Sequence, residues 1–224
     1  MSRTMADRHF AYYPALLDLF DRRAVVVGGG EVATTKVQGL LPCGLRDLIV
    51  VAPEVSALIG MAARAGYLVW RQQEFQPEDL EGAQVAFAAT DDRGVNARVA
   101  EEARRRGVWV LTVDDVPHCD FIAPALVRRG GLTIAISTGG ASPAIAYWVK
   151  KQLEVLVPAW WGELLEIAGG VRDQVRHWPH RPDATAWRQA LDAGVTDAVA
   201  TGEREQARRL LVEKLEQARP RSMP

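Results

Sequence analysis

The chain has 224 residues and a formal net charge of −1, with 48% apolar and 25% charged residues. This composition is ordinary for a folded globular protein, and it leaves no overall charge to attract nucleic acid or an anionic membrane. No apolar run reaches the roughly 18 residues of a membrane-spanning helix, so we expect neither partner.

The first thirteen residues are rich in charged side chains and lack an apolar core, so we expect no secretory signal peptide. Cys43 and Cys119 lie far apart in the sequence and show no pairing pattern. We interpret both as free thiols in a reducing compartment, which makes the cytoplasm the expected location.

Short apolar strands alternate with helical patterns through the first half of the chain. Strands are predicted at 24–27, 48–52, 67–70, 84–89 and 108–113. Helices are predicted at 31–41, 55–65 and 95–106. Near-continuous apolar strands between helices are typical of a parallel sheet covered on both faces. We therefore predict an α/β fold in which residues 1–113 form a Rossmann-like domain.

The pattern changes after residue 113. Two short strands, 125–129 and 132–136, are joined by a Gly-Gly turn, which predicts a β-hairpin. Further helices are predicted at 144–157, 160–178, 183–193 and 201–218. The expected organisation is a Rossmann-like parallel sheet (1–113), a small β-containing segment (114–143) and a C-terminal helical domain (144–224).

A glycine cluster connects the first strand to the first helix. The spacing Gly28-x-Gly30-x-x-Ala33 is that of a dinucleotide-binding turn, in which small residues allow a tight bend and close approach of a pyrophosphate. Free N–H groups and the helix dipole then favour the phosphates. The cofactor contacts expected here are Gly28, Gly29, Gly30, Glu31 and Val32. The alternative is a strand–helix turn that binds nothing.

Two later strand ends complete the expected cofactor site. The acidic residue that usually holds the ribose about 20 residues further on is missing, so we expect backbone groups of Ala52 and Pro53 to edge the adenosine. No arginine stands at that strand end to favour a 2′-phosphate, which favours NAD over NADP. Ala89, Thr90 and Asp91 end another strand and leave room for the nicotinamide ribose. The alternative is that Thr90 and Asp91 only cap the next helix.

Asp114 and Asp115 follow the fifth strand at the same edge of the sheet. A carboxylate there can accept a proton as a hydride leaves, although the pair can also serve only a turn. His118, Cys119 and Asp120 are potential metal ligands, but contiguous side chains diverge and a structural zinc site needs four ligands at characteristic spacings. We expect no stably bound metal.

Residues 137–142, Ser-Thr-Gly-Gly-Ala-Ser, form a second segment suited to anions, because hydroxyls, glycine N–H groups and a helix start converge there. The segment is flanked in sequence by Arg128, Arg129, Lys150 and Lys151. A polycarboxylate substrate would suit it. The alternative is a capped helix with an ordinary charged surface.

Tryptophans and aliphatic residues recur at helical spacing in the following segment. They are Ile145, Trp148, Leu153, Leu156, Trp160 and Trp161. This pattern predicts either a helical core or a dimer seam, and we favour the core.

Taken together, these motifs resemble the precorrin-2 dehydrogenase family, of the siroheme synthase N-terminal type. The resemblance spans about residues 12–157. It rests on 26–33 with Lys36, 50–53, 88–92 with Asn96, 113–115 with 119–121, and 137–143. The Val-Asp-Asp…Cys-Asp-Phe and Ser-Thr-Gly-Gly-x-Ser-Pro motifs are its most specific part.

The resemblance implies NAD-dependent oxidation of precorrin-2, a tetrapyrrole, to sirohydrochlorin for siroheme or cobalamin synthesis. It also implies a homodimer in which residues 114–143 contribute to dimerisation and to the active site. The family's catalytic aspartate falls on Asp114. Its dinucleotide contacts fall on the glycine turn, on Glu31-Val32 and on Ala52-Pro53. Substrate contacts are expected at Ser137, Thr138 and Gly139.

The chain departs from the family pattern at three positions. Thr138 stands where one branch has a regulatory phosphoserine, Leu111 stands where asparagine is common, and Thr35 stands where a basic residue is usual. Because the sequence stops at Pro224, we expect no fused methyltransferase domain.

Two other functions stay open at this point. One is a bifunctional enzyme that also inserts Fe²⁺, as a substrate, into sirohydrochlorin. The other is a non-catalytic NAD-sensing module, which explains the glycine turn but leaves Asp114 and residues 137–143 without a role.

Overall fold

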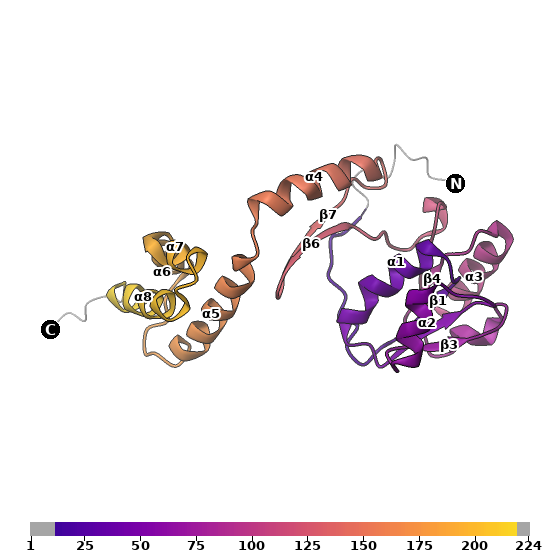
Figure 1. Cartoon of the computed structure of the whole chain (residues 1–224), viewed down its shortest axis with the longest axis horizontal. Coiled ribbons are helices and arrows are strands. Elements are labelled where there is room, and N and C mark those ends of the chain that lie inside the picture. The colour runs from indigo at the N-terminus through magenta and orange to yellow at the C-terminus, as the bar shows by residue number, and fades with distance from the viewer. Residues whose placement is uncertain (1–11, 219–224) are drawn as a thin grey trace. The chain divides into compact units, whose positions relative to one another are not determined.

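The computed structural model describes residues 12–218. The N-terminal segment for which we expect no signal peptide lies almost wholly outside the described residues. By packing, the chain divides into two compact units (Figure 1). The first runs to residue 123 and includes 139–141, and the second comprises 124–138 and the chain from 142 onward. The three-part division at residues 113 and 143 stays a prediction.

The first unit is built on the predicted parallel sheet. Its strands are β1 (Arg23–Val27), β2 (Asp47–Val51), β3 (Val69–Arg71), β4 (Val85–Ala88) and β5 (Trp109–Thr112). Their order in the sheet is β3-β2-β1-β4-β5, and every neighbouring pair is parallel. Val27 pairs with both Val51 and Ala88, so the carboxyl ends of the three central strands lie level at one edge. The Rossmann-like fold class is confirmed.

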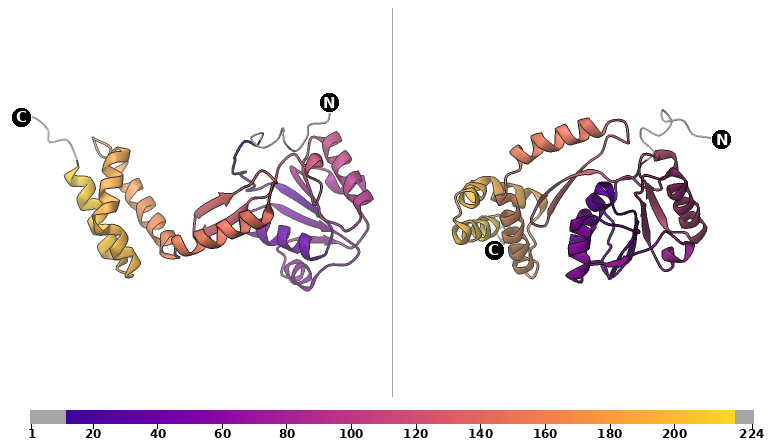
Figure 2. Two further views of the ribbon diagram at one scale, coloured as in Figure 1. Left: turned by 90° about the horizontal axis from the view of Figure 1, so that it is seen from above. Right: turned by 45° about the vertical axis from the view of Figure 1, so that its right-hand side comes forward.

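Helices cover both faces of this sheet (Figure 2). Alternate residues of β1 enter opposite cores: Ala24 and Val26 pack with α1 (Glu31–Leu40) and α2 (Ala57–Arg64), whereas Val25 and Val27 pack with α3 (Arg93–Arg106). Both sets of side chains are almost fully buried, which is why the strands are continuously apolar. Short 3₁₀ turns lie at Leu41–Cys43, Pro77–Leu80 and Val116–His118.

Capping side chains and glycines set the helix bounds in this unit. Helix α2 begins at residue 57 rather than at the predicted 55, because the Ser56 hydroxyl caps it by accepting from Ile59 N. The Asp92 carboxylate caps α3. Gly107 ends α3 in the left-handed conformation, with φ of 70°, as a C-terminal glycine is expected to do.

The second unit begins with the predicted hairpin of β6 (Ala125–Arg129) and β7 (Leu132–Ile136), which pair antiparallel. The helices are α4 (Pro143–Leu156), α5 (Trp160–Val175), α6 (Ala184–Ala190), α7 (Thr196–Ala200) and α8 (Arg204–Gln217). One apolar cluster joins α5 to α8. The Arg129 guanidinium donates to the carbonyls of Val157 (2.7 Å) and Glu154 (2.9 Å), and so satisfies the last turn of α4.

Predicted helix bounds also differ from the structure in the second unit, where α5 ends at residue 175 rather than 178. Helix α6 continues through a π-helical turn (Leu191–Val195) into α7, and the chain kinks at Gly194, where φ is 85°. The last helix begins at residue 204 instead of 201, because Gly202 also has φ of 85° and closes α7. None of the described helices is both long and apolar enough to cross a membrane.

The prediction that the tryptophan-rich stretch forms a core is partly wrong. Trp148 is 63% exposed and lies on α4 beside exposed Ile145 and Leu156. Trp160, by contrast, packs against the cluster of α5 to α8 and stacks on Trp161, with ring centroids 5.5 Å apart. Helical spacing identified the apolar face of α4 correctly, but in the part of the chain that the structure describes these side chains stay exposed.

The helical cluster should depend on Leu211, which is fully buried on α8. Leu211→Ala should lower the free energy of unfolding by about 2–5 kcal/mol through lost burial and a residual cavity. Urea unfolding followed by circular dichroism measures this change. The matched control is Arg209→Ala on the exposed side of α8, expected within about 0.5 kcal/mol of wild type. Equal stability of the two variants would contradict the packing described.

Candidate active site

A cleft of about 870 Å³ opens at the carboxyl edge of the parallel sheet. It is formed by the segments that follow β1, β2, β3 and β4 and by the first turns of α3. The ten residues expected to contact a dinucleotide all line it: Gly28, Gly29, Gly30, Glu31, Val32, Ala52, Pro53, Ala89, Thr90 and Asp91. The structure therefore brings them together, and their contacts with a ligand stay a prediction.

The three glycines of the turn have different local requirements. A Cβ on Gly28 would lie 2.2 Å from the carbonyl oxygen of Ala89, and φ at Gly28 is 123°. A Cβ on Gly29 would lie 1.9 Å from the carbonyl oxygen of Glu54. A Cβ on Gly30 would meet nothing within 4 Å. The first two glycines allow the turn to pack against neighbouring loops, and the third leaves space at the cleft.

Helix α1 starts at the cleft without a side-chain cap. No side chain caps it at Gly30, whereas the other long helices of this unit are capped by Ser56 and Asp92. The Thr34 hydroxyl bonds instead to the Gly30 carbonyl (2.9 Å) and to the Ser56 hydroxyl (2.7 Å). Backbone N–H groups of the first turn thus keep their capacity for an anion, which the helix dipole favours.

Side chains from β3 and the turn after it fix the next wall of the cleft. The Trp70 indole donates to the Ala52 carbonyl (2.9 Å) and holds the end of β2. The Asp79 carboxylate is 3% exposed and accepts hydrogen bonds from Arg71 (2.7 Å) and Gln73 (3.2 Å). This buried carboxylate sets the path of residues 73–75, which line the cleft.

Sequence reasoning missed part of this wall. The lining residues of the whole cleft that were not anticipated are Val27, Val51, Glu54, Gln73, Glu74, Phe75, Asp92, Val95 and Arg98. The Arg98 guanidinium lies 5.9 Å from the centroid of the Phe75 ring and donates to the Phe75 carbonyl (3.5 Å). A usable signal existed, because β3 is a parallel strand whose carboxyl end must also face this edge.

The loop after β4 is held by one buried amide. Asn96 is 5% exposed, and its Oδ1 accepts from the Thr90 N–H (3.1 Å) and hydroxyl (2.8 Å). Its Nδ2 donates to the Thr90 carbonyl (2.9 Å). The residue that caps α3 is Asp92, so Asp91 is left exposed at the cleft.

Asp114 stands at the end of the neighbouring strand. Val113 N donates to the Ala88 carbonyl (3.0 Å), which places Asp114 beside the end of β4. Asp114 is exposed and adopts a left-handed backbone conformation, with φ of 57°. It is not one of the residues that line the 870 Å³ cleft. The structure thus brings Asp114 to the edge of the sheet at which the cleft opens, but not into the lining of the cleft.

The three consecutive potential metal ligands diverge as expected. His118 pairs with Asp115 (Nδ1 to Oδ2, 2.6 Å), Cys119 bonds to the backbone, and Asp120 accepts from Val110 N (2.9 Å). Among residues 12–218, no three His, Cys, Asp or Glu side chains are grouped as a metal site would require.

Lys36 of α1 and Cys119 interact electrostatically in the same part of the unit. Burial lowers the pKa of Lys36, and the nearby thiol of Cys119 partly opposes this shift. Burial likewise raises the pKa of Cys119, so the thiol keeps its proton at neutral pH.

The predicted substrate segment lies after β7. Ser137 and Thr138 belong to the second unit and Gly139 to the first. The Thr138 hydroxyl accepts from Ser142 N and donates to Ser142 O (both 3.1 Å), and Ser142 caps α4. Three of the four flanking cations are engaged elsewhere: Arg129 at the end of α4, and both Lys150 and Lys151 with Glu154. These contacts therefore do not support a role for these three side chains in binding an anion at residues 137–142.

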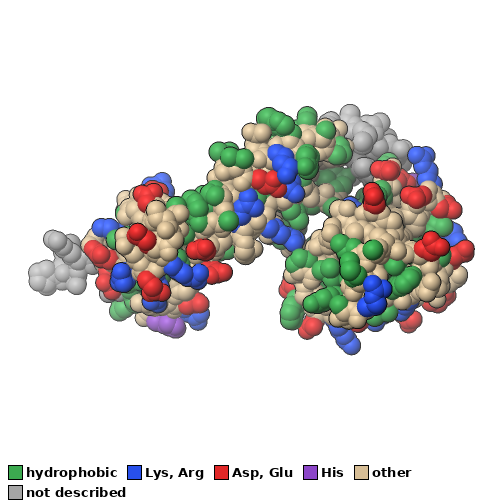
Figure 3. All heavy atoms as spheres, viewed as in Figure 1, with side chains coloured by type: hydrophobic (Ala, Val, Ile, Leu, Met, Phe, Trp, Pro, Cys, Tyr) green, Lys and Arg blue, Asp and Glu red, His purple; other side chains and the backbone are tan. Residues whose placement is uncertain are grey.

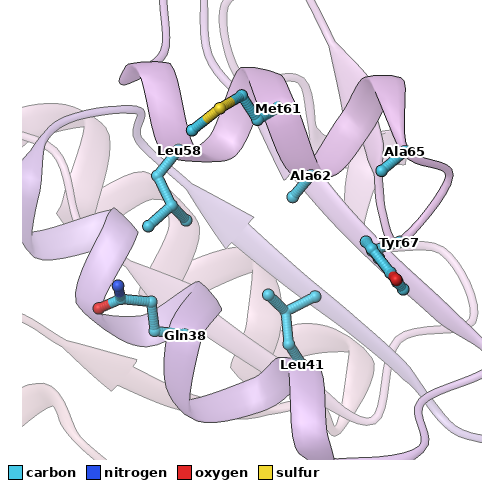
Figure 4. Close-up of a pocket in the computed structure, with 7 residues that line it drawn as sticks. All are labelled: Gln38, Leu41, Leu58, Met61, Ala62, Ala65 and Tyr67. Carbon is cyan, nitrogen blue, oxygen red and sulfur yellow. The ribbon is translucent and has the colours of Figure 1, made fainter.

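A second, apolar hollow of about 440 Å³ lies between α1 and α2 (Figure 4). Gln38 and Leu41 face Leu58 and Met61 across it, and Tyr67 closes one end. Gln38 and the tyrosine hydroxyl are its only polar side-chain groups among the described lining residues. It lacks the convergent polar groups that a site for chemistry needs.

Comparison with known proteins gives two family matches. Residues 15–125 match a family described as putative NAD(P)-binding, and residues 129–156 match the central region of sirohaem biosynthesis proteins. Siroheme synthase of Photorhabdus laumondii is 40% identical over 209 residues, which cover 92% of this chain and 44% of that protein. Siroheme synthase of Methylococcus capsulatus is 37% identical over 215 residues, covering 95% and 45%.

A solved structure is similar over its whole length. It is described as SirC, precorrin-2 dehydrogenase, and it superposes with a TM-score of 0.71 at 27% identity, covering 92% of this chain and 100% of that chain. This chain spans less than half of the length of the siroheme synthases it matches. By sequence and by fold, the chain is thus similar to a precorrin-2 dehydrogenase over the whole of that chain and to less than half of each siroheme synthase it matches.

Proposed function

We propose that this chain oxidises precorrin-2 to sirohydrochlorin, with NAD as the hydride acceptor. The observation that carries the proposal is the presence, at one edge of the sheet, of an uncapped helix start in the cleft and of a carboxylate, Asp114, which follows β5 and lies beside the end of β4. In this reaction a carbon–carbon single bond of the macrocycle becomes a double bond. One hydrogen leaves as a hydride to the nicotinamide and the other as a proton to a base.

The cleft suits a dinucleotide on two grounds. The open space at Gly30 and the uncapped first turn of α1 suit a pyrophosphate. The lining carries five carboxylates and one cation: Glu31, Glu54, Glu74, Asp91, Asp92 and Arg98. This excess of negative charge disfavours a further phosphate on the ribose, which supports NAD rather than NADP.

Asp114 is the proposed base. It is exposed beside the end of β4, where a reacting group next to the nicotinamide ribose would lie. Substrate contacts are proposed at Ser137, Thr138 and Gly139, where the bonded Thr138 hydroxyl shapes the loop rather than standing free. Nothing observed in the described residues favours iron insertion, so Fe²⁺ as a second substrate is not part of the proposal.

We also propose that the active form is a homodimer. The exposed side chains on one stripe of α4 are Ile145 (56%), Trp148 (63%), Val155 (80%) and Leu156 (70%). Hydrophobic side chains gather along this helix in Figure 3. Positions 145, 148, 155 and 156 fall within about a third of the helix circumference, and an exposed apolar stripe of this kind is typical of a protein interface.

Asp114→Asn should abolish most turnover while leaving NAD binding intact. Removing a general base lowers kcat by about 10²–10⁴-fold, and the amide keeps the size of the carboxylate. The measurement is anaerobic NADH formation from precorrin-2, with NAD affinity determined by calorimetry. The matched control is Asp115→Asn, which loses only an exposed pair with His118.

Three outcomes separate the rival functions. Turnover by wild type and its loss in Asp114→Asn alone support the dehydrogenase. Tight NAD binding without any turnover by wild type would instead identify a sensing module. Turnover that is equally fast in the Asp114→Asn variant would remove Asp114 from the mechanism.

Gly30→Ala and Gly29→Ala should separate ligand binding from folding. The Gly30 variant should fold normally and bind NAD at least about tenfold more weakly, about 1.4 kcal/mol, because its methyl group occupies space needed by the phosphates. The Gly29 variant should lose about 1–3 kcal/mol of stability through its clash with the Glu54 carbonyl. Thermal unfolding and NAD titration measure both effects. Unchanged NAD affinity in Gly30→Ala would place the phosphates elsewhere.

Trp148→Glu should weaken the homodimer, because a charge would have to be buried in an apolar interface. Analytical ultracentrifugation over a range of protein concentrations measures the monomer fraction. Gln189→Glu, exposed on α6, adds the same charge away from the stripe and should leave association unchanged. A wild-type chain that is monomeric throughout would overturn the dimer proposal.

A further inference from the structure

The segment after the turn at Asp114 folds back and binds both sides of that turn. Cys119 Sγ accepts from Thr112 N (3.2 Å) and lies within donating distance of the carbonyls of Thr112 (3.1 Å) and Asp115 (3.3 Å). Thr112 precedes the turn and Asp115 follows it. One side chain therefore links the residues on either side of Asp114.

Asp120 fastens the same segment to the edge strand. Its carboxylate accepts from Val110 N (2.9 Å), and its own N–H donates to the Val110 carbonyl (2.8 Å). Because β5 is the edge strand of the five-stranded sheet, its outer backbone groups have no neighbouring strand to pair with. The two bonds of Asp120 satisfy those of Val110. Cys119 is thus held against a fixed element rather than against a mobile loop.

The turn needs such support because of its backbone. A non-glycine residue in the left-handed conformation costs about 1–2 kcal/mol, and it persists where the surrounding structure over-determines it. Asp114 has φ of 57° and is exposed, so its own side chain contributes little packing to this conformation. The bonds of Cys119 to Thr112 N and to the Asp115 carbonyl bridge the turn.

We propose that Cys119 and Asp120 form a brace that fixes the direction of the Asp114 carboxylate, and that both act as positioning residues which do not touch the substrate. This inference rests on the proposed role of Asp114 as the base. The half-buried thiol suits the task because it keeps its proton and can therefore donate as well as accept. Its packing against the first apolar cluster, to which Leu111 belongs, restricts its movement.

The two functions of Cys119, hydrogen bonding and packing, can be separated by two variants. Cys119→Val keeps an apolar side chain of similar size and removes every bond. Cys119→Ser keeps a group that donates and accepts. We expect kcat for NADH formation to fall on the order of ten- to a hundredfold in the valine variant, as for a small misplacement of a catalytic group. The serine variant should stay within about threefold of wild type.

A second readout does not require turnover. Hydrogen exchange of the peptide covering residues 110–120 should become faster in Cys119→Val and stay as in wild type in Cys119→Ser. NAD affinity should be unchanged in both, because no residue of the brace lines the cleft. Cys43→Ser is the matched control, since its thiol donates only to the Gly39 carbonyl at the end of α1.

The outcomes distinguish the brace from the proposed function. If wild type does not oxidise precorrin-2, the proposed function fails, and the exchange measurement still tests whether Cys119 holds the turn. Equal kcat and equal exchange in the valine variant and wild type would overturn the brace. A fall in kcat that serine does not rescue, accompanied by weaker NAD binding, would reduce Cys119 to a general packing role and would also overturn it.

Discussion

The close approach of the glycine turn to its neighbours is the constraint on which the cleft at the carboxyl edge of the sheet depends. Gly28 faces the Ala89 carbonyl and Gly29 faces the Glu54 carbonyl, at distances that exclude any Cβ. The turn is thereby wedged between the loops that follow β4 and β2, which lie on either side of β1 in the sheet. Because the turn packs directly against these two loops, the uncapped start of α1 lines the cleft. A larger residue at either position would lift the turn and separate the helix dipole from the place where phosphates would bind.

A common device holds the other loops at this edge of the sheet. Each is fastened by a side chain from a later segment: Trp70 holds the end of β2, Asp79 the loop after β3, and Asn96 the loop after β4. After β5, only a short 3₁₀ turn (Val116–His118) follows, and Cys119 bonds back to the end of the strand. Loops at the carboxyl edge carry function but lack regular backbone pairing, so these polar contacts supply the rigidity that a preorganised site needs.

The sequence was informative wherever local chemistry determines local geometry. Glycine spacing located the turn, and the end of each strong apolar strand located a wall of the cleft. It predicted the strand at 67–70, but the loop after this strand and the exposed side of α3 carry no motif, and the cleft contacts of residues 73–75 and of Arg98 were missed. The exposure of Trp148 was missed for another reason: helical spacing shows that a face is apolar but not what covers it. Likewise, sequence proximity suggested free cations beside Thr138, whereas Lys150 and Lys151 bind Glu154, only a turn away.

A dinucleotide turn is shared by enzymes and by proteins that only sense the cofactor, so the turn does not separate these functions. Asp114 is the more informative residue. A sensor gains nothing from a non-glycine residue held in the left-handed conformation at the edge of its cofactor cleft, where glycine would be accommodated without strain. The strain at Asp114 is retained, and the adjoining segment supplies bonds on both sides of it. Strain that neighbouring residues maintain at the edge of a ligand cleft is characteristic of a group whose direction matters. The same carboxylate stands beside the end of β4, where a base could accept a proton as the hydride departs. This combination favours chemistry over sensing more strongly than the cofactor site alone does.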